Sequence, residues 1–500
     1  MFHLNIPFFS SVLALALLAL FLLNCLYSLF KPQKNLPPSP PKLPIIGNLH
    51  QLGTYPHRSL QSLSRKYGQL MLLHLGSAPV LVVSSADAAS EIMKTHDLIF
   101  SDRPHSSMPD KLLYGSKDIG FSPYGEYWRQ VRSICVLHFL NNKRVQSFRH
   151  VREEETSQMI EKIRKSRLVN LSEIFATLTN DVVCRVALGR KYSDGERGSN
   201  KFKELLCGFG ELLGAVNIGD YIPWLSWVNR FNGLDAKAEK VAKEIDEFLE
   251  SVVADRKNRS KKPQSDSIAS NFLDIMLEIQ EGDLAGFAIE QDTIKALILD
   301  MFAAGSDTTS TVMEWAMAEL LKHPEKMKKL QYEIRQVAQD KPEINEDDLE
   351  KLPYLKAVIK ETLRLHIPLS LLVPRKSMED INIMGYNISS GTQVIVNAWA
   401  IARDQQWWED PEEFRPERFL NNNIDFRGFH FQFIPFGSGR RRCPGSTFAI
   451  AINEVALGKL LHKFNFALPN ETKPEHLDMS ECFGLTVRKR LPLIVVATPY

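Results

Sequence analysis

The chain has 500 residues, of which 44% are hydrophobic and 24% are charged. This composition is typical of a globular protein with a large core, and a formal net charge of +2 is too small to indicate a nucleic-acid partner. The six cysteines form no C-x-x-C pair, so their spacing predicts neither a zinc site nor a disulfide framework.

An uncharged apolar run over residues 6–30 begins the chain. As a helix it would be about 37 Å long, enough to cross a hydrocarbon core of about 30 Å. A cleaved signal peptide would need a basic start and a small-residue cleavage site, and this run has neither. Because Lys31, Lys34 and Lys42 all follow the run, the positive-inside rule places the rest of the chain in the cytosol. We therefore predict a transmembrane anchor over residues 1–30 and a single-pass topology.

Prolines crowd the next segment, residues 31–45, and predict a stiff, extended hinge between membrane and globule. We expect Ile45 and Ile46, directly after these prolines, to dock on the globule. Residues 46–500 contain no repeat and no composition break that marks a boundary. They are expected to form a single catalytic domain.

The domain is expected to be mainly α with small β-sheets. Residues 70–84 read as a β-hairpin, and residues 378–397 read as a second small β unit. Helical periodicity extends over 144–165, 235–256, 291–321, 324–338 and 354–366. Loops or short helices are expected at 101–121, 208–230 and 256–271. The glycines of 208–214 are misplaced for a dinucleotide loop, so no NAD or flavin site is visible.

Residues 435–445, PFGSGRRRCPG, place Cys443 between three arginines and a Pro-Gly turn. The stretch 446–464 reads as a long helix, so Cys443 should lie just before its N-terminus. The helix dipole and the arginines both lower a thiol pKa and favour a thiolate, which is either a nucleophile or a metal ligand. No local Cys-His signature supports a nucleophile. A haem-ligating thiolate fits better, with Phe436 shielding the sulfur.

Two further motifs, KETLR and FRPERF, carry charges that would support the cysteine loop. Glu361 and Arg364 are three residues apart and share a helix face, but such pairs are common on protein surfaces. FRPERF at 414–419 adds Arg418. Taken together with the cysteine loop, the three residues predict a buried charge network that braces it.

The apolar helix 291–321 is interrupted by AAGSDTTST. One interpretation is a local kink, with threonine side chains bonding to the preceding turn. The other is a proton relay, in which Asp307 and Thr308 serve a metal-bound oxygen and Gly305 leaves room for the ligand. In EYWRQVR, Trp128 and Arg132 lie one turn apart. They form either an ordinary amphipathic face or a contact with the anionic edge of a cofactor.

With these motifs in this order, the chain resembles the cytochrome P-450 family of haem-thiolate monooxygenases along essentially its whole length. PPSPPKLPIIGNLHQLG and GRRRCPG are similar to the plant microsomal A-type enzymes, closest to subfamilies acting on coumarins and terpenoids. The resemblance implies the cytochrome P-450 fold and haem b (iron protoporphyrin IX) as the cofactor.

The resemblance also implies a role for each motif residue. Cys443 would be the axial ligand of the haem iron, and Asp307 and Thr308 the catalytic acid–alcohol pair. The structural triad would be Glu361, Arg364 and Arg418. The propionates would be held by Trp128, Arg132, Arg375 and Arg441.

Electrons would come from NADPH only indirectly, through NADPH–cytochrome P-450 reductase, which fits the missing dinucleotide site. Arg440 and Arg442 are expected to face this partner or solvent, and cytochrome b5 would be a second electron donor. The implied location is the endoplasmic reticulum membrane, with the catalytic domain cytosolic. The implied reaction inserts one oxygen atom from O2 into a coumarin or furanocoumarin, a terpenoid or a phenolic.

The substrate pocket is expected to be apolar. Its walls would be Phe121, Leu297, Met301, Ala304, Ile367, Leu371, Phe483 and Leu485. In HIPLSLLVPR, Ile367 and Ser370 replace prolines usual in the plant enzymes, which should alter pocket shape.

Two other functions remain as alternatives. A haem-thiolate lyase or isomerase would work without reductase, but that class tends to lose the acid–alcohol pair, which is intact here. A non-catalytic haem or scaffold protein is the third possibility.

Overall fold

The computed structural model of the chain describes Ala19 and residues 35–191, 197–260, 271–282, 289–482 and 484–500. The predicted anchor at 1–30, Ala19 apart, and the pocket residue Phe483 lie outside the described residues. In the described part, no single helix has the length and apolar character needed to cross a membrane. One bent pair, Glu204–Tyr221 with Pro223–Phe231, meets the length and composition of a span.

Helices make up most of the described chain, which confirms the mainly α class. The longer ones are α2 Pro56–Tyr67, α5 Glu126–His138, α7 Arg149–Arg164, α8 Leu171–Leu188, α9 Arg197–Leu213, α12 Leu234–Ser260, α13 Phe272–Gly282, α14 Gln291–Gly305, α15 Asp307–Lys322, α16 Pro324–Ala338, α18 Pro353–Leu365 and α20 Ser446–Lys463. The short ones are α3 Ala86–Ser90, α4 Ser107–Leu112, α6 Asn142–Ser147, α10 Ile218–Tyr221, α11 Val228–Phe231, α17 Glu346–Leu349 and α19 Ala398–Ile401. Single turns are η1 Leu49–Gln51, η2 Glu91–Thr95, η3 Pro223–Leu225, η4 Pro416–Phe419, η5 Pro469–Glu471 and η6 Pro474–His476.

The strands form small sheets, as expected. The largest has the order β1 (Leu70–Leu75), β2 (Ala78–Val83), β7 (Gln393–Val396), β4 (Arg375–Lys376). A second sheet has the order β3 (Leu168–Asn170), β11 (Ile494–Pro499), β8 (Phe464–Ala467), and two pairs are β5 (Ile381–Ile383) with β6 (Tyr386–Ile388) and β9 (Glu481–Cys482) with β10 (Arg488–Lys489).

Both predicted β units are present, but the second one divides. β1 and β2 pair antiparallel as the expected hairpin, with Leu70 opposite Val83. Of the second unit, only β5 and β6 form a hairpin, whereas β7 runs parallel to β2. Val394 and Val396 of β7 are buried in the same core as β2, and this burial selects the distant partner.

The predicted helices 235–256, 324–338 and 354–366 are confirmed as α12, α16 and α18. Two predicted helices are each broken in two. The break in 144–165 falls at Phe148, whose buried ring packs against Phe139, and the break in 291–321 falls at Ser306. Tertiary packing accounts for the break at Phe148, which periodicity does not report, whereas the break at Ser306 lies within the motif for which the sequence offered a local kink.

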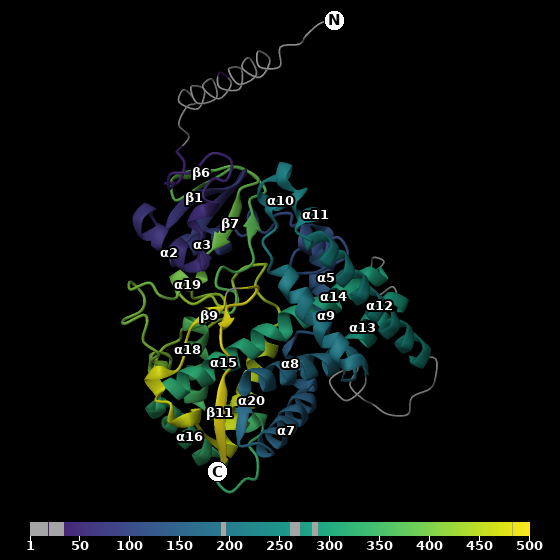
Figure 1. Cartoon of the computed structure of the whole chain (residues 1–500), viewed down its shortest axis with the longest axis vertical. Coiled ribbons are helices and arrows are strands. Elements are labelled where there is room, and N and C mark those ends of the chain that lie inside the picture. Colours follow the sequence, from purple (N-terminus) through teal and green to yellow (C-terminus); the bar gives the residue numbers. More distant parts are fainter. Residues whose placement is uncertain (1–18, 20–34, 192–196, 261–270, 283–288, 483) are drawn as a thin grey trace, which may run out of the picture.

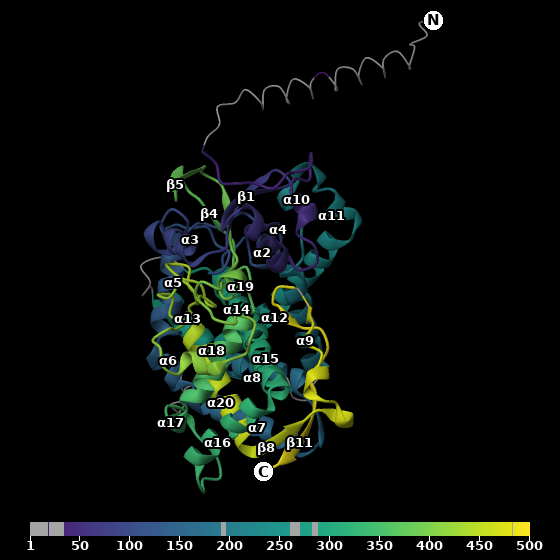
Figure 2. The same cartoon turned by 90° about the vertical axis from the view of Figure 1, so that its left-hand side faces the viewer.

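The two ends of the molecule differ in secondary structure (Figure 1). The β1–β2–β7 sheet lies at one end with α2, α3, α10 and α11, and most of the longer helices lie at the other end together with β11. Within the helical part, α15 packs against α8, α18 and α20, and the four labels stay together after a 90° turn (Figure 2). Trp315 of α15 is fully buried in this core.

The described part of the proline hinge is fixed to the sheet. The Leu72 amide donates to the Pro38 carbonyl at 2.9 Å, and Pro37 and Pro40 are buried. Ile45, expected to dock, is instead 62% exposed at a turn where its φ is +70°. The turn is closed by Gly47, where a Cβ would lie 2.0 Å from the His74 carbonyl oxygen, so glycine is required.

Candidate functional site

Cys443 lies at the end of a tight turn directly before α20. Its backbone amide donates to the Phe436 carbonyl at 2.9 Å, which closes the turn around the thiol. The amides of Gly445 and Ser446, at the first turn of α20, point at the sulfur. The helix N-terminus therefore lies against Cys443, as the sequence predicts.

The pKa of the Cys443 thiol differs in direction from the sequence-based prediction. Burial raises it above its ordinary value, although the Gly445 amide, Arg132, Arg442 and the Ser446 amide act to lower it. The prediction was wrong because it counted charges and dipole but not desolvation by the surrounding chain. A positively charged metal ion at the sulfur would reverse this balance, because a coordinating thiol is deprotonated outright.

The cysteine loop approaches the rest of the protein most closely at Gly439. A Cβ there would lie 2.2 Å from Oδ1 of Asp97 and 2.4 Å from the Met93 carbonyl oxygen. Asp97 accepts from the Arg440 amide at 3.0 Å and from Nη1 of Arg375 at 3.0 Å. One buried carboxylate thus fixes the loop to β4, and sequence analysis missed it because it lies over 300 residues away from the motif.

The predicted propionate residues come together beside this loop from three elements. Arg132 of α5 donates to the Arg442 carbonyl at 2.5 Å, and Arg375 of β4 donates to the Ser438 carbonyl at 2.6 Å. Arg441 points inward and is only 8% exposed. Arg103 joins them, donating to the Gly120 carbonyl at 2.8 Å. No role was assigned to Arg103 from the sequence.

These four arginines form what we call the arginine cluster: Arg103, Arg132, Arg375 and Arg441. Burial and then repulsion from Arg375 and Arg132 lower the pKa of Arg441 to about 9. Burial, followed by repulsion from Arg441 and Arg375, lowers the pKa of Arg103 well below its ordinary value. Such mutual repulsion among buried cations indicates a site for an anionic group, which would relieve it.

Trp128 contributes differently from the prediction. Its indole N–H, assigned from the sequence to a cofactor edge, donates to the Ile119 carbonyl at 3.0 Å. The ring faces Arg441, whose guanidinium carbon lies 4.0 Å from the ring centroid. Trp128 therefore holds a loop and stacks on Arg441, one of the buried arginines of the cluster.

Glu361, Arg364 and Arg418 form one buried network. Arg364 makes a bidentate pair with Glu361, at 2.8 and 2.9 Å, and neither side chain is exposed. Arg418 donates to Oε1 of Glu361 at 2.9 Å. The network reaches the segment just before the cysteine loop through Trp408, which lies near both guanidinium groups and donates to the Gln432 carbonyl.

The helix break at Ser306 lies between Ala304 and Thr308. The Thr308 hydroxyl donates to the Ala304 carbonyl at 2.5 Å, so the kink and the pair proposed for a relay occur together. Gly305 does not leave room for a ligand, because a Cβ there would meet Cγ2 of Val183 on α8 at 3.1 Å. Glycine at this position allows two helices to pack closely.

Asp307 is held by residues close to the C-terminus. The Thr486 hydroxyl donates to one carboxylate oxygen, and Nη1 of Arg488 lies 3.5 Å from the other. Thr486 is buried, whereas the Arg488 side chain is 54% exposed. Asp307 thus connects Thr308 to the protein surface. Neither partner has a signal in the sequence, since the contacts span about 180 residues.

Several predicted pocket residues have solvent-accessible side chains. Ala304 is exposed in the middle of the central helix, and its neighbours before and after, 293–299 and 309–321, are buried. The partly exposed ones are Phe121, Met301, Leu371 and Leu485. Leu297 and Ile367 are each 1% exposed and belong to two hydrophobic cores, so their role as walls stays a prediction.

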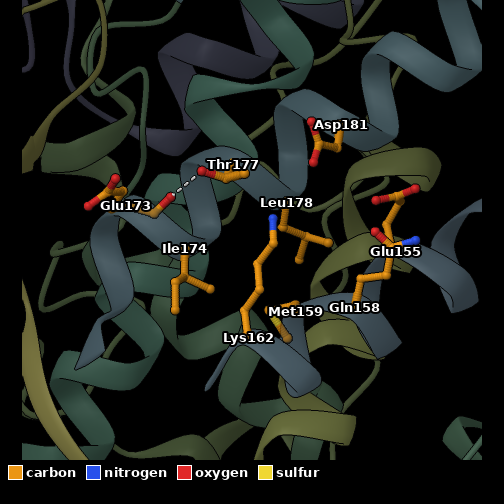
Figure 3. Close-up of a pocket in the computed structure, with 9 residues that line it drawn as sticks. All are labelled: Glu155, Gln158, Met159, Lys162, Glu173, Ile174, Thr177, Leu178 and Asp181. Carbon is orange, nitrogen blue, oxygen red and sulfur yellow. Dashed lines mark hydrogen bonds between the residues drawn. The ribbon is translucent and has the colours of Figure 1, made fainter. Parts of the chain in front are cut away.

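A separate cavity of about 210 Å³ lies between α7 and α8 (Figure 3). Its nine lining residues include none of the residues above. Glu155 and Asp181 are at one side and Lys162 reaches toward Leu178. Glu155 is already paired with Arg185 and Lys191, at 2.7 and 2.5 Å.

Comparison with known proteins gives concordant results. A family model described as "Cytochrome P450" matches residues 37–495. The chain is 58% identical to "Norfluorocurarine oxidase" of Strychnos sp, over 98% of both chains. It is 54% identical to "(+)-menthofuran synthase" of Mentha piperita, over 93% of this chain and 94% of that one. A solved zebra fish cytochrome P450 with abiraterone has a TM-score of 0.75 at 26% identity, covering 90% of this chain and 100% of the other.

The charge network yields a test. Glu361→Gln should leave Arg364 as an unpaired buried charge and destabilise the fold by about 3–5 kcal/mol. Glu346→Gln is a matched control, because Glu346 pairs in the same bidentate way with the fully buried Arg152. Both variants should lose stability in thermal unfolding. Only Glu361→Gln should speed the reaction of Cys443 with a thiol reagent, read by peptide mass spectrometry. Equal rates in both variants would show that the network does not brace the loop.

Proposed function

The chain belongs to the cytochrome P450 family of monooxygenases, and on this premise we propose that it inserts one oxygen atom from O2 into a small lipophilic plant specialised metabolite. The resemblance drawn from the sequence motifs is thereby confirmed at the level of the family. The observation that carries the proposal is the position of Cys443, at the N-terminus of α20 and beside a cluster of buried arginines.

The residues present fit a haem. Its two propionates would supply the negative charge that the arginine cluster lacks, and Cys443 would be the single protein ligand of the iron. Phe436 closes the turn around this thiol through its carbonyl group and packs edge-on against Phe426 at 5.5 Å. When bound, a thiolate-ligated haem supplies the activation of O2.

Asp307 and Thr308 deliver protons in this proposal. The Thr308 hydroxyl can exchange its bond to the Ala304 carbonyl for one to a ligand, since Ala304 borders open space. Asp307 can take up a proton at the exposed side, where Arg488 lies, and pass it inward. Thr486 keeps the carboxylate at the junction of α14 and α15.

The proposal includes several chemical classes of lipophilic substrate. The apolar, partly exposed side chains of Phe121, Met301, Ala304, Leu371 and Leu485 suit a lipophilic molecule. Relatives named for norfluorocurarine and menthofuran support an alkaloid or a terpenoid, and the coumarins and phenolics expected from the motifs stay within the proposal.

Electrons are proposed to come from NADPH through a separate NADPH–cytochrome P-450 reductase, with cytochrome b5 as a second donor. A basic surface beside the cysteine loop supports docking of an acidic partner. Arg440 and Arg427 have side chains 50% and 71% exposed, and Arg129 of α5 is also exposed. Arg442 is half-buried and bonds to Ser446, so it belongs to the loop more than to this surface.

We place the chain in the endoplasmic reticulum membrane, anchored by residues 1–30, with the catalytic domain cytosolic. An exposed apolar surface supports this proposal. It consists of two segments joined at the β1–β2 turn, where Ser77 donates to the Tyr221 carbonyl and Gly76 to the Ile46 carbonyl. Its large apolar residues are Leu36, Leu43, Ile45, Val216, Ile218, Trp224, Trp227 and Phe231. Figure 1 shows α10, α11 and β1 at the same end of the molecule.

The proposed reaction is tested with the full chain, NADPH and purified reductase, against a panel of terpenoids, alkaloids, coumarins and phenolics. We expect O2- and reductase-dependent oxygenated product from the wild type, and an absorption band of the reduced CO complex typical of thiolate ligation. Cys443→Ala should lose both, while Cys207→Ala, at an exposed cysteine, should lose neither. Product formation without reductase would instead support the lyase or isomerase.

Two adjacent threonines provide a test of the relay. Thr308→Ala should keep haem and substrate binding but divert reducing equivalents to peroxide, lowering product per NADPH by about 10-fold or more. Thr309→Val is the matched control, because Thr309 is 1% exposed and faces the core. It should stay coupled. Tight coupling in Thr308→Ala, measured as product against NADPH consumed, would argue against the relay.

The apolar surface is tested with the full chain in nanodiscs. Trp224→Phe combined with Trp227→Phe should remove most of the fluorescence that brominated lipids quench, because these indoles would lie at the headgroup level. Trp407→Phe removes a third exposed tryptophan, 43% exposed and outside this surface. That control should leave the quenched fraction unchanged. Equal quenching of the double variant and the wild type would refute the membrane contact.

A further inference from the structure

The loop 118–122, between α4 and α5, supplies backbone acceptors to two members of the arginine cluster, Arg103 and Arg441. The Ile119 carbonyl accepts from Trp128 and Arg441, and the Gly120 carbonyl accepts from Arg103. The Ser122 carbonyl accepts from Nη2 of Arg441 at 2.7 Å. The conformation of this loop therefore helps to fix Arg103, Arg441 and Trp128.

The amide groups of the same loop are held by two aspartates. The Ile119 amide donates to Oδ2 of Asp300 at 2.7 Å, and the Phe121 amide donates to Oδ2 of Asp118 at 2.7 Å. Asp300 belongs to α14, four residues before Ala304 and eight before Thr308, so it shares their helix face. The Asp300 bond thereby attaches the loop 118–122 to α14.

The two carboxyl groups lie side by side. A Cβ on Gly120 would lie 3.1 Å from Oδ2 of Asp118 and 3.7 Å from Oδ1 of Asp300. Asp118 is 0% exposed, and in the part of the chain that the structure describes its Oδ1 has no hydrogen-bond partner. Two carboxylates in contact, Asp118 fully buried and Asp300 half-buried, cannot both be ionised without a cost, whereas one proton between them satisfies the orphaned oxygen.

We propose that Asp118 and Asp300 share one proton and act as a pair of positioning residues, which clamp the loop 118–122 onto α14 in the conformation that the arginine cluster requires. The proposal rests on the proposed function only in that it takes this cluster to be the cofactor site. Gly120 is part of the device, since a side chain would meet both carboxyl groups.

The surrounding groups favour this arrangement. Arg103 and Arg441 face Asp118 and stabilise its ionised form. From α5, Cys135 faces Asp300 and Tyr127 faces Asp118, and neither is a cation. Burial and then the neighbouring Asp118 raise the pKa of Asp300 well above its ordinary value, and burial also raises the pKa of Asp118. The proton is therefore held mainly on Asp300.

The raised pKa values of the two aspartates set the direction in which stability of the clamp changes with pH. A carboxyl whose pKa is higher in the folded state stabilises that state at low pH, and the contribution is lost as pH rises through the raised pKa. The clamp should therefore be closed in mildly acidic solution. Its loss at higher pH frees the Ile119 and Phe121 amides together.

The test is hydrogen exchange of the full-length, haem-loaded protein between about pH 6 and 9, the range reached by buried carboxyl groups. We expect protection of residues 118–122, corrected for intrinsic rates, to fall by about tenfold or more across this range. Asp300→Asn keeps an acceptor oxygen and carries permanent N–H donors, so its protection should not vary with pH. Asp118→Asn is a second variant with the same expectation.

Asp292→Asn is the matched control, because Asp292 is on the same helix with its side chain 49% exposed. It should retain the wild-type pH profile. Wild-type protection that does not change with pH, or an unchanged pH dependence in Asp300→Asn, would overturn the proposal. The readout follows backbone amides and not product, so it remains decisive whether or not the monooxygenase assay finds a substrate.

Discussion

Burial of positive charge beside Cys443 is the constraint on which the site depends. Arg103, Arg375 and Arg441 are buried, and their donors go mostly to backbone carbonyls. Those carbonyls come from the segment before α5, from the residues before β4 and from the cysteine loop. Each of these segments is irregular, and each is held in place because its oxygen atoms face a guanidinium group. The remaining electrostatic cost is what makes the region receptive to an anion.

Two other parts of the structure border the site, the Glu361 network and the α14–α15 junction. The Glu361 network on α18 is linked through Trp408 to the Gln432 carbonyl, three residues before the cysteine loop begins. At the α14–α15 junction, the Thr308 hydroxyl bonds to the Ala304 carbonyl, and Asp307 lies beside the exposed Arg488 side chain. Both depend on helices that pack closely, as the contact of Gly305 with Val183 illustrates.

The sequence predicted what is local and missed what is distant. Cys443, Glu361 with Arg364, and Asp307 with Thr308 stand in short motifs whose spacing carries their geometry. Asp97, Arg103, Thr486 and Asp300 act across roughly 180 to 340 residues, and single-sequence patterns do not encode such contacts. A single sequence also does not show how strongly a group is desolvated, which is why the predicted direction of the Cys443 pKa shift was wrong. The break at Phe148 and the parallel pairing of β7 depend on packing partners in the same way, whereas a kink near Ser306 was one of the two interpretations that the sequence offered.

The attachment of Asp307 to Thr486 and Arg488 has a consequence for how the protein is made. These partners lie in the last fifteen residues of the chain, just before β11 completes its sheet with β3 and β8. During synthesis the N-terminal part emerges and folds first. The acid at the start of α15 therefore stays without these partners until residues 486–488 have emerged, about 180 residues after Asp307 itself, so this side of the site is completed late in synthesis.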